Sequence, residues 1–88
     1  MKAYQITYYV INRINKTVDK YFSTEETTYN TIEAFADSIA NRISSNKFTF
    51  VDTDRIANGT VFQRTGFLSD DIVKFQVDAI INPCEEDQ

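Results

Sequence analysis

Residues 31–45, TIEAFADSIANRISS, decide the fold, because they carry the only clear pattern of an amphipathic helix in the chain. Apolar residues recur at the spacing that places them along one side of an α-helix, namely Ile32, Phe35, Ala36, Ile39, Ala40 and Ile43. A helix with one apolar side has to bury that side against another layer of structure. The rest of the chain has the patterns of strands and turns, so we expect the helix to lie across a β-sheet.

Capping residues mark both ends of this helix. Asn30 is the expected N-cap, and Glu33 stands three residues later, where its carboxylate closes a capping box. Asn46 is the expected left-handed residue that ends the helix. An earlier start near Thr24 is the alternative, because acidic residues would then occupy the positive end of the helix dipole.

Five segments outside the helix have the character of β-strands. They are residues 3–12, 17–23, 47–51, 56–57 with 60–64, and 72–81. The first two form a hairpin whose loop of four or five residues lies within the turn at 12–16. Asn58-Gly59 fits a type I′ hairpin turn, and the polar residues 52–54 predict a bulge or a break. The polar residues 24–29 and a turn at 65–71 that contains Gly66 are expected to connect neighbouring elements.

These elements predict an α+β fold in the order β-β-α-β-β-β. One helix packs on a mainly antiparallel sheet of four or five strands, because hairpins dominate the connections. Residues 1–83 form a single domain, and residues 84–88 form an acidic, frayed tail. The expected core consists of Tyr4, Ile6, Tyr8, Val10, Val18, Phe22, Ile32, Phe35, Ile39, Ile43, Phe48, Phe50, Val73, Phe75 and Val77.

The net charge of −4 is unevenly distributed along the 88 residues. Three of the thirteen acids lie in the tail, and residues 1–24 alone carry a net charge of +3. The surface is therefore expected to be dipolar, which argues against a strongly basic DNA binder and against a uniformly acidic DNA mimic.

A single cysteine, Cys84, excludes an internal disulfide and a cysteine zinc site. The N-terminus lacks the pattern of a signal peptide, and no apolar run is long enough to span a membrane. We therefore expect a cytoplasmic protein that does not enter a membrane.

The sequence offers little material for catalysis, and we expect neither an enzyme nor a bound cofactor. It contains no histidine, and Cys84 lies beside acids that would make it a poorer thiolate. The two glycines lie in different turns, so no phosphate-binding loop is present. The acidic residues Asp52, Asp54, Asp70 and Asp71 are expected to be solvated turn residues, and a weak cation site is the alternative.

The sheet face that the helix leaves uncovered is the candidate binding surface. We expect it to present Tyr9, Ile11, Arg13, Lys20 and Tyr21. Tyrosine-rich patches suit protein interfaces, so the favoured partner is another protein or a second copy of the chain. These tyrosines are also compatible with ordinary sheet positions whose hydroxyls reach water.

Two binding functions therefore follow from the sequence. The first is a small protein-binding module that inhibits or regulates its partner. The second is a single-stranded nucleic-acid binder in which Tyr9 and Tyr21 stack on bases while Lys16 and Lys20 contact phosphates. The small size and plain composition resemble those of accessory proteins of phages and mobile elements, although no motif carries this resemblance.

Overall fold

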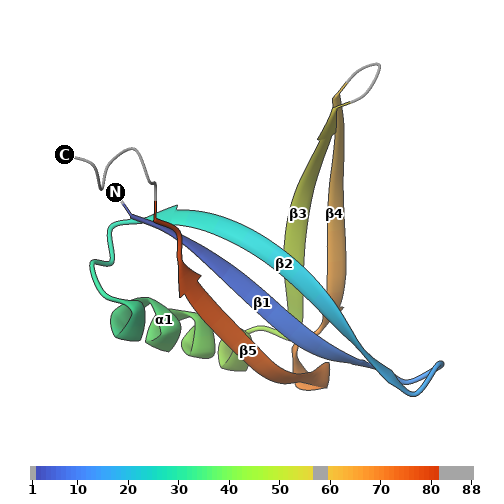
Figure 1. The fold of residues 1–88 in the computed structure, drawn as a ribbon. Coiled ribbons are helices and arrows are strands. Elements are labelled where there is room, and N and C mark those ends of the chain that lie inside the picture. Colours follow the sequence, from blue (N-terminus) through green and yellow to red (C-terminus); the bar gives the residue numbers. More distant parts are fainter. Residues whose placement is uncertain (1, 57–59, 82–88) are drawn as a thin grey trace.

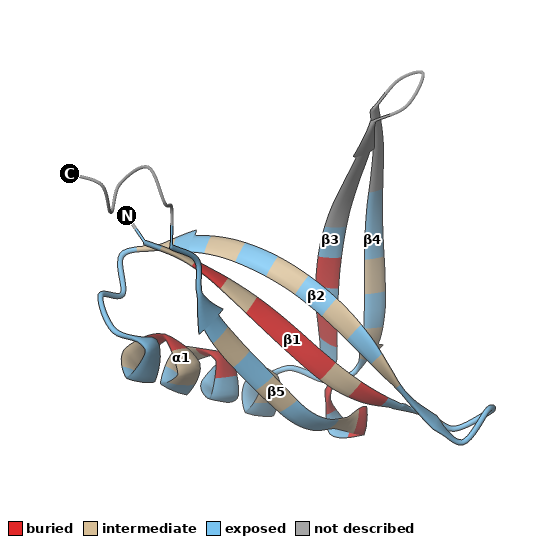
Figure 2. Ribbon diagram, viewed as in Figure 1, coloured by how far each residue is buried: buried red, intermediate tan, exposed pale blue. Residues whose placement is uncertain are grey.

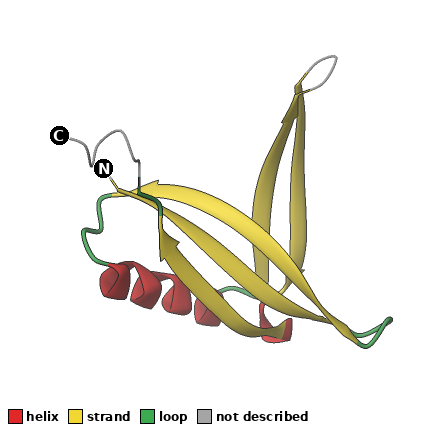
Figure 3. Ribbon diagram, viewed as in Figure 1, coloured by secondary structure: helices red, strands yellow, loops and turns green. Residues whose placement is uncertain are grey.

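The computed structural model describes residues 2–56 and 60–81, and it describes side chains in these ranges outside 53–62. Its elements are β1 (Lys2–Asn12), β2 (Thr17–Thr27), α1 (Ile32–Ser45), β3 (Phe48–Ile56), β4 (Thr60–Leu68), the short 3₁₀ helix η1 (Ser69–Asp71) and β5 (Ile72–Ala79) (Figures 1 and 3). The predicted α+β class and the order β-β-α-β-β-β are confirmed. All strand pairs are antiparallel.

The five strands divide into two sheets. A three-stranded sheet has the order β2-β1-β5, and a two-stranded sheet consists of β3 and β4. Helix α1 runs along one face of the three-stranded sheet, and the far half of the β3–β4 hairpin extends away from it (Figure 1). We call the face toward α1 the inner face and the opposite face the outer face.

Strand β1 is central, and it supplies most of the core (Figure 2). The buried apolar residues are Tyr4, Ile6, Tyr8 and Val10 of β1, Phe35 and Ile39 of α1, and Val51 of β3. Six of these seven belong to the expected core, and Val51 is the addition. Ile43, Phe75 and Val77 pack against this cluster while partly exposed.

Six residues of the expected core are exposed instead: Val18, Phe22, Ile32, Phe48, Phe50 and Val73. The register of the first hairpin explains the two residues in β2. Its turn places Asn12 opposite Thr17 and therefore Tyr8 opposite Tyr21. Residues directly opposite each other share a face, so Tyr21 faces inward with Tyr8. Phe22 then lies opposite Thr7 on the outer face.

Strand β3 also turns its smaller side chains inward. Thr49 and Val51 are buried, whereas Phe48 and Phe50 are about half exposed on the other side. The Thr49 hydroxyl forms a 2.7 Å hydrogen bond with the Ser69 hydroxyl, which satisfies both buried polar groups.

The pairing of β3 with β4 is regular. It runs without a register shift from Phe48 opposite Leu68 to Ile56 opposite Thr60, so the bulge expected at 52–54 is absent from this ladder. Phe50 lies opposite Gly66, where an added Cβ would come within 2.6 Å of the ring. The glycine therefore lets the Phe50 ring lie flat on β4.

The helix begins one residue later than expected. Thr31 is the N-cap, and its hydroxyl accepts a 3.2 Å hydrogen bond from the backbone N–H of Ala34. Glu33 is consequently the second helical residue, so the expected capping box and the alternative start near Thr24 are wrong. Asn46 is extended rather than left-handed, and its side-chain amide donates to the Arg42 carbonyl at 2.8 Å.

Several boundaries also differ from the expected ones. Residues 24–27 continue β2 and residues 65–68 continue β4, so both expected connections are shorter. The last strand ends at Ala79. The hairpin expected around Asn58-Gly59 forms, because Ile56 pairs with Thr60. The turn itself, Cys84 and the tail lie outside the described residues.

Candidate binding surface

The outer face carries exposed apolar side chains on adjacent strands. Val18 and Ile11 lie opposite each other and are 54% and 39% exposed. Phe22 is 54% exposed and lies opposite the buried Thr7. Helix α1 and the buried side of the β3–β4 hairpin both lie on the inner face, so no described element covers this patch (Figure 1). We define the outer patch as Tyr9, Ile11, Val18, Lys20, Phe22 and Lys74.

Two lysines flank the centre of the outer patch. Tyr9 on β1 lies opposite Lys20 on β2 and opposite Lys74 on β5. The ammonium nitrogen of Lys20 lies 5.5 Å from the centre of the Tyr9 ring, and that of Lys74 lies 4.9 Å away. Both distances are within the range of cation–π attraction. Neither lysine forms an ion pair with a described carboxylate, so both charges are available to a partner.

The opposite end of the outer face is acidic. Glu26 lies opposite Ala3, and Asp78 lies opposite Gln5. Asp78 also accepts a 3.1 Å hydrogen bond from Gln76 of the same strand. The face is therefore dipolar along β1, with its positive end at the apolar residues.

The structure brings together three of the five residues that the sequence predicts for this surface. Tyr9, Ile11 and Lys20 are neighbours on the outer face. Tyr21 lies on the inner face instead, where its ring stacks on Phe67 with centroids 4.8 Å apart. The register of the β1–β2 hairpin explains this difference, because it places Tyr9 and Tyr21 on opposite faces of the sheet.

Arg13, the fifth predicted residue, is engaged in an ion pair at the hairpin turn. Its guanidinium donates hydrogen bonds of 3.0 Å and 2.6 Å to one carboxylate oxygen of Asp71. These bonds raise the pKa of Arg13 above its ordinary value. Asp71 is only 8% exposed, so this contact fixes the turn to η1.

The surface predicted from the sequence did not include Val18, Phe22 or Lys74. Lys74 carried a signal, because the alternation of the last strand turned it away from the expected core. Val18 and Phe22 carried no such signal, because hydrophobic side chains are expected to be buried. Only the number of residues in the turn between β1 and β2 could have placed them on the outer face.

The acidic residues do not form the alternative cation site within the described side chains. Asp71 is paired with Arg13, and Asp52 accepts a 2.8 Å hydrogen bond from Arg64. No three potential metal ligands gather among the residues that the structure describes. Asp71 is therefore a buried ion-pair member rather than a solvated turn acid. The side chain of Asp54 lies outside the description.

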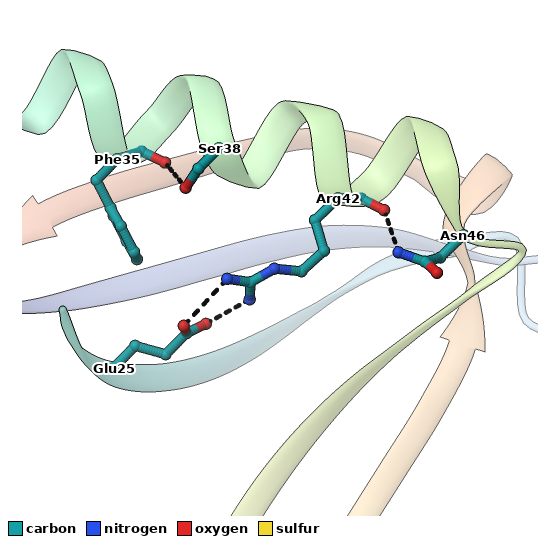
Figure 4. Close-up of polar contacts among 5 residues, drawn as sticks. All are labelled: Glu25, Phe35, Ser38, Arg42 and Asn46. Carbon is teal, nitrogen blue, oxygen red and sulfur yellow. Dashed lines mark hydrogen bonds and ion pairs between the residues drawn. The ribbon is translucent and has the colours of Figure 1, made fainter. Parts of the chain in front are cut away.

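A second ion pair joins the helix to the sheet on the inner face. The guanidinium of Arg42 on α1 donates to the two carboxylate oxygens of Glu25 on β2 at 2.6 Å and 3.2 Å (Figure 4). These hydrogen bonds raise the pKa of Arg42. Figure 4 also shows Asn46 and Ser38 bonded to backbone carbonyls of the helix, Ser38 to that of Phe35 at 2.6 Å. The Arg42–Glu25 pair thereby links the C-terminal half of α1 to β2.

Comparison with known proteins adds no functional assignment, because no protein-family model, curated protein or solved structure matches the chain. Among the described residues, no helix has the length and apolar character needed to cross a membrane.

Proposed function

We propose that this chain is a non-enzymatic protein-binding module that inhibits or regulates a partner by occupying its surface. The observation that carries the proposal is the outer patch, where Ile11, Val18 and Phe22 expose apolar area beside two cations. Apolar and aromatic side chains of this kind form the centre of protein interfaces, surrounded by polar groups.

The charges of the outer patch define the partner. Lys20 and Lys74 face outward without a described carboxylate partner. A complementary surface has an apolar centre against Phe22 and Val18, and carboxylates placed near the two ammonium groups. Such complementarity favours specific orientation and fast association.

Nucleic-acid binding is the second candidate, supported by the same two lysines beside an aromatic ring. Stacking of bases needs open ring faces, whereas both ammonium groups lie over the Tyr9 ring. The proposed second stacking ring, Tyr21, lies on the inner face. A protein partner needs neither ring to be free, which is why we favour it.

Two further parts of the proposal rest on composition. A non-enzymatic role fits a chain without histidine, the commonest general base. A cytoplasmic setting fits a chain with one cysteine, since small secreted domains usually depend on disulfides.

The proposal is tested by capture from a lysate of the source organism. The wild-type chain and the Phe22→Ala and Phe50→Ala variants serve as baits, because Phe22 and Phe50 are 54% and 53% exposed on different surfaces. We expect one protein to be retained by the wild type and by Phe50→Ala, to survive nuclease, and to be lost from Phe22→Ala.

Other outcomes identify the alternatives. Nucleic acid that is recovered at low salt and lost at moderate salt favours the second candidate, because phosphate contacts weaken steeply with ionic strength. Recovery of the bait alone, together with a dimer in sedimentation velocity, assigns the outer patch to self-association and contradicts the proposed partner.

A further inference from the structure

A cleft of about 460 Å³ lies on the inner face, between the end of α1, β2 and the base of the β3–β4 hairpin. Tyr8, Glu25, Arg42, Phe48, Phe50 and Arg64 are among its lining residues. None of the outer-patch residues lines it, so it can bind a ligand independently of the partner proposed above.

Among the described residues, the hydroxyl of Tyr8 is a hydrogen-bonding group that no other residue uses. Tyr8 is 2% exposed, and its hydroxyl forms no hydrogen bond with a described residue. No polar side-chain atom in the described part of the chain is both sealed from solvent and unpartnered. Tyr8 lines the cleft, so its hydroxyl is the polar group there that can bind a ligand.

The charged groups of the cleft compensate each other. Arg42 is paired with Glu25 from β2, and Arg64 is paired with Asp52 through bonds of 2.8 Å and 3.3 Å. The two pairs sum to no net charge, so the cleft favours a ligand that is itself uncharged. Arginine and carboxylate groups together still offer both donors and acceptors.

The aromatic part of the cleft comes from Phe48 and Phe50. Their rings lie 6.5 Å apart and are 48% and 53% exposed. The guanidinium of Arg64 lies 5.5 Å from the centre of the Phe50 ring, within the range of cation–π attraction. This wall provides a position for an apolar side chain.

Strand edges form the remaining walls. Ser23, Thr24 and Glu25 are consecutive in β2 and all line the cleft, as do Phe48, Thr49 and Phe50 in β3. Side chains alternate along a strand, so three consecutive lining residues place the backbone itself in the wall. Within the described residues β2 pairs only with β1, and β3 pairs only with β4. Unpaired edges of this kind accept an extended chain as an added strand.

From this combination we infer that the cleft binds an extended, uncharged peptide segment of a partner protein. The segment lies along a strand edge, places an apolar side chain against Phe48 and Phe50, and accepts a hydrogen bond from the Tyr8 hydroxyl through a backbone carbonyl.

The test uses a phage-displayed library of short random peptides, selected on the full-length chain. Enriched peptides are synthesised with both ends capped, and their affinities are measured by isothermal titration. We expect uncharged sequences with a central apolar residue, whose affinity falls about three- to tenfold in Tyr8→Phe through loss of one hydrogen bond. In Phe50→Ala we expect a loss of about fivefold or more.

Two matched controls locate the site. Tyr9→Phe removes the hydroxyl of the adjacent residue, and Phe22→Ala removes an equally exposed ring, both on the outer face. Neither should change peptide affinity. A failure to enrich any peptide would overturn the inference. The same conclusion would follow from peptides that bind Tyr8→Phe and Phe50→Ala as tightly as the wild type, or that lose affinity in the two controls. None of these results bears on the outer patch.

Discussion

Tyr4 on β1 and Phe35 on α1 stack with ring centroids 4.6 Å apart and an angle of 15° between the rings. Both residues are 1% exposed, and this contact joins the helix to the central strand. The Tyr4 hydroxyl extends beyond the stack and donates to the Tyr29 carbonyl at 3.2 Å, so its polar end is satisfied as well.

Replacing Phe35 by alanine should remove this contact and leave a cavity. We expect a loss of about 3–5 kcal/mol in the free energy of unfolding, a large share of the stability of so small a domain. Urea denaturation measures the loss. Phe22→Ala is the control, because that ring is 54% exposed and its removal should cost about 0.5 kcal/mol or less. If Phe35→Ala and the parent had equal urea midpoints, the packing of Phe35 against Tyr4 would be contradicted.

The N-cap can be tested with two adjacent residues. Thr31→Ala removes the acceptor of the Ala34 N–H, and we expect it to cost about 1 kcal/mol. Asn30→Ala should be close to neutral, because Asn30 precedes the cap. Thermal unfolding of the two variants decides between the positions, and the reverse order of stabilities would restore Asn30 as the cap.

The Arg13–Asp71 pair predicts unequal effects of two arginine substitutions. Arg13→Ala deprives Asp71, whose side chain is 12% exposed, of its partner, whereas the Arg64 partner, Asp52, has a side chain that is 43% exposed. An unpaired buried charge is more costly than a solvated one. Arg13→Ala should therefore lower the urea midpoint more than Arg64→Ala. Equal midpoints would show that water replaces the guanidinium at Asp71.

The burial of Tyr8 predicts a stability change at alkaline pH. Burial raises the pKa of its hydroxyl above the ordinary value of 10.0, while Arg42 opposes and Glu25 adds to the shift. Above pH 10.0 the unfolded chain ionises at this residue before the folded chain does, so the unfolded state binds fewer protons and stability falls as pH rises. The loss is absent below pH 10.0 and complete above the raised pKa.

Tyr8→Phe isolates this contribution, because the two proteins share every other side chain. The stability of the wild type relative to Tyr8→Phe should be constant at neutral pH and should decline above pH 10.0 in urea denaturation. A difference that stayed constant, or that grew in favour of the wild type, would contradict the raised pKa of Tyr8.

The helix, the order of elements along the chain and the buried face of β1 were predictable because each has a strong local signal. The apolar side of α1 and the alternation of β1 each point to one buried face. The face of β2 was not predictable in this way. A five-residue turn at 12–16 would place Phe22 opposite Ile6 on the inner face, whereas the observed four-residue turn places Phe22 opposite Thr7. A slip of one residue reverses every side chain of the strand.

Strand β3 shows a second limit of sequence patterns. Hydrophobicity favours burial of Phe48 and Phe50, but the inward side carries Thr49, which bonds to Ser69, and Val51. Tertiary contacts, rather than the hydrophobic pattern, determine which side of β3 is buried. The expected surface lost Tyr21 for the same reason that it gained Phe22, since both follow from one hairpin register.

The most direct test of the proposed function is a binding isotherm for the captured partner with the wild-type, Phe22→Ala and Phe50→Ala chains. The outer patch predicts that Phe22→Ala weakens binding by about tenfold or more, while Phe50→Ala stays within about twofold of the wild type. Unchanged affinity in Phe22→Ala, with loss in Phe50→Ala, would contradict the outer patch and place the partner in the inner cleft.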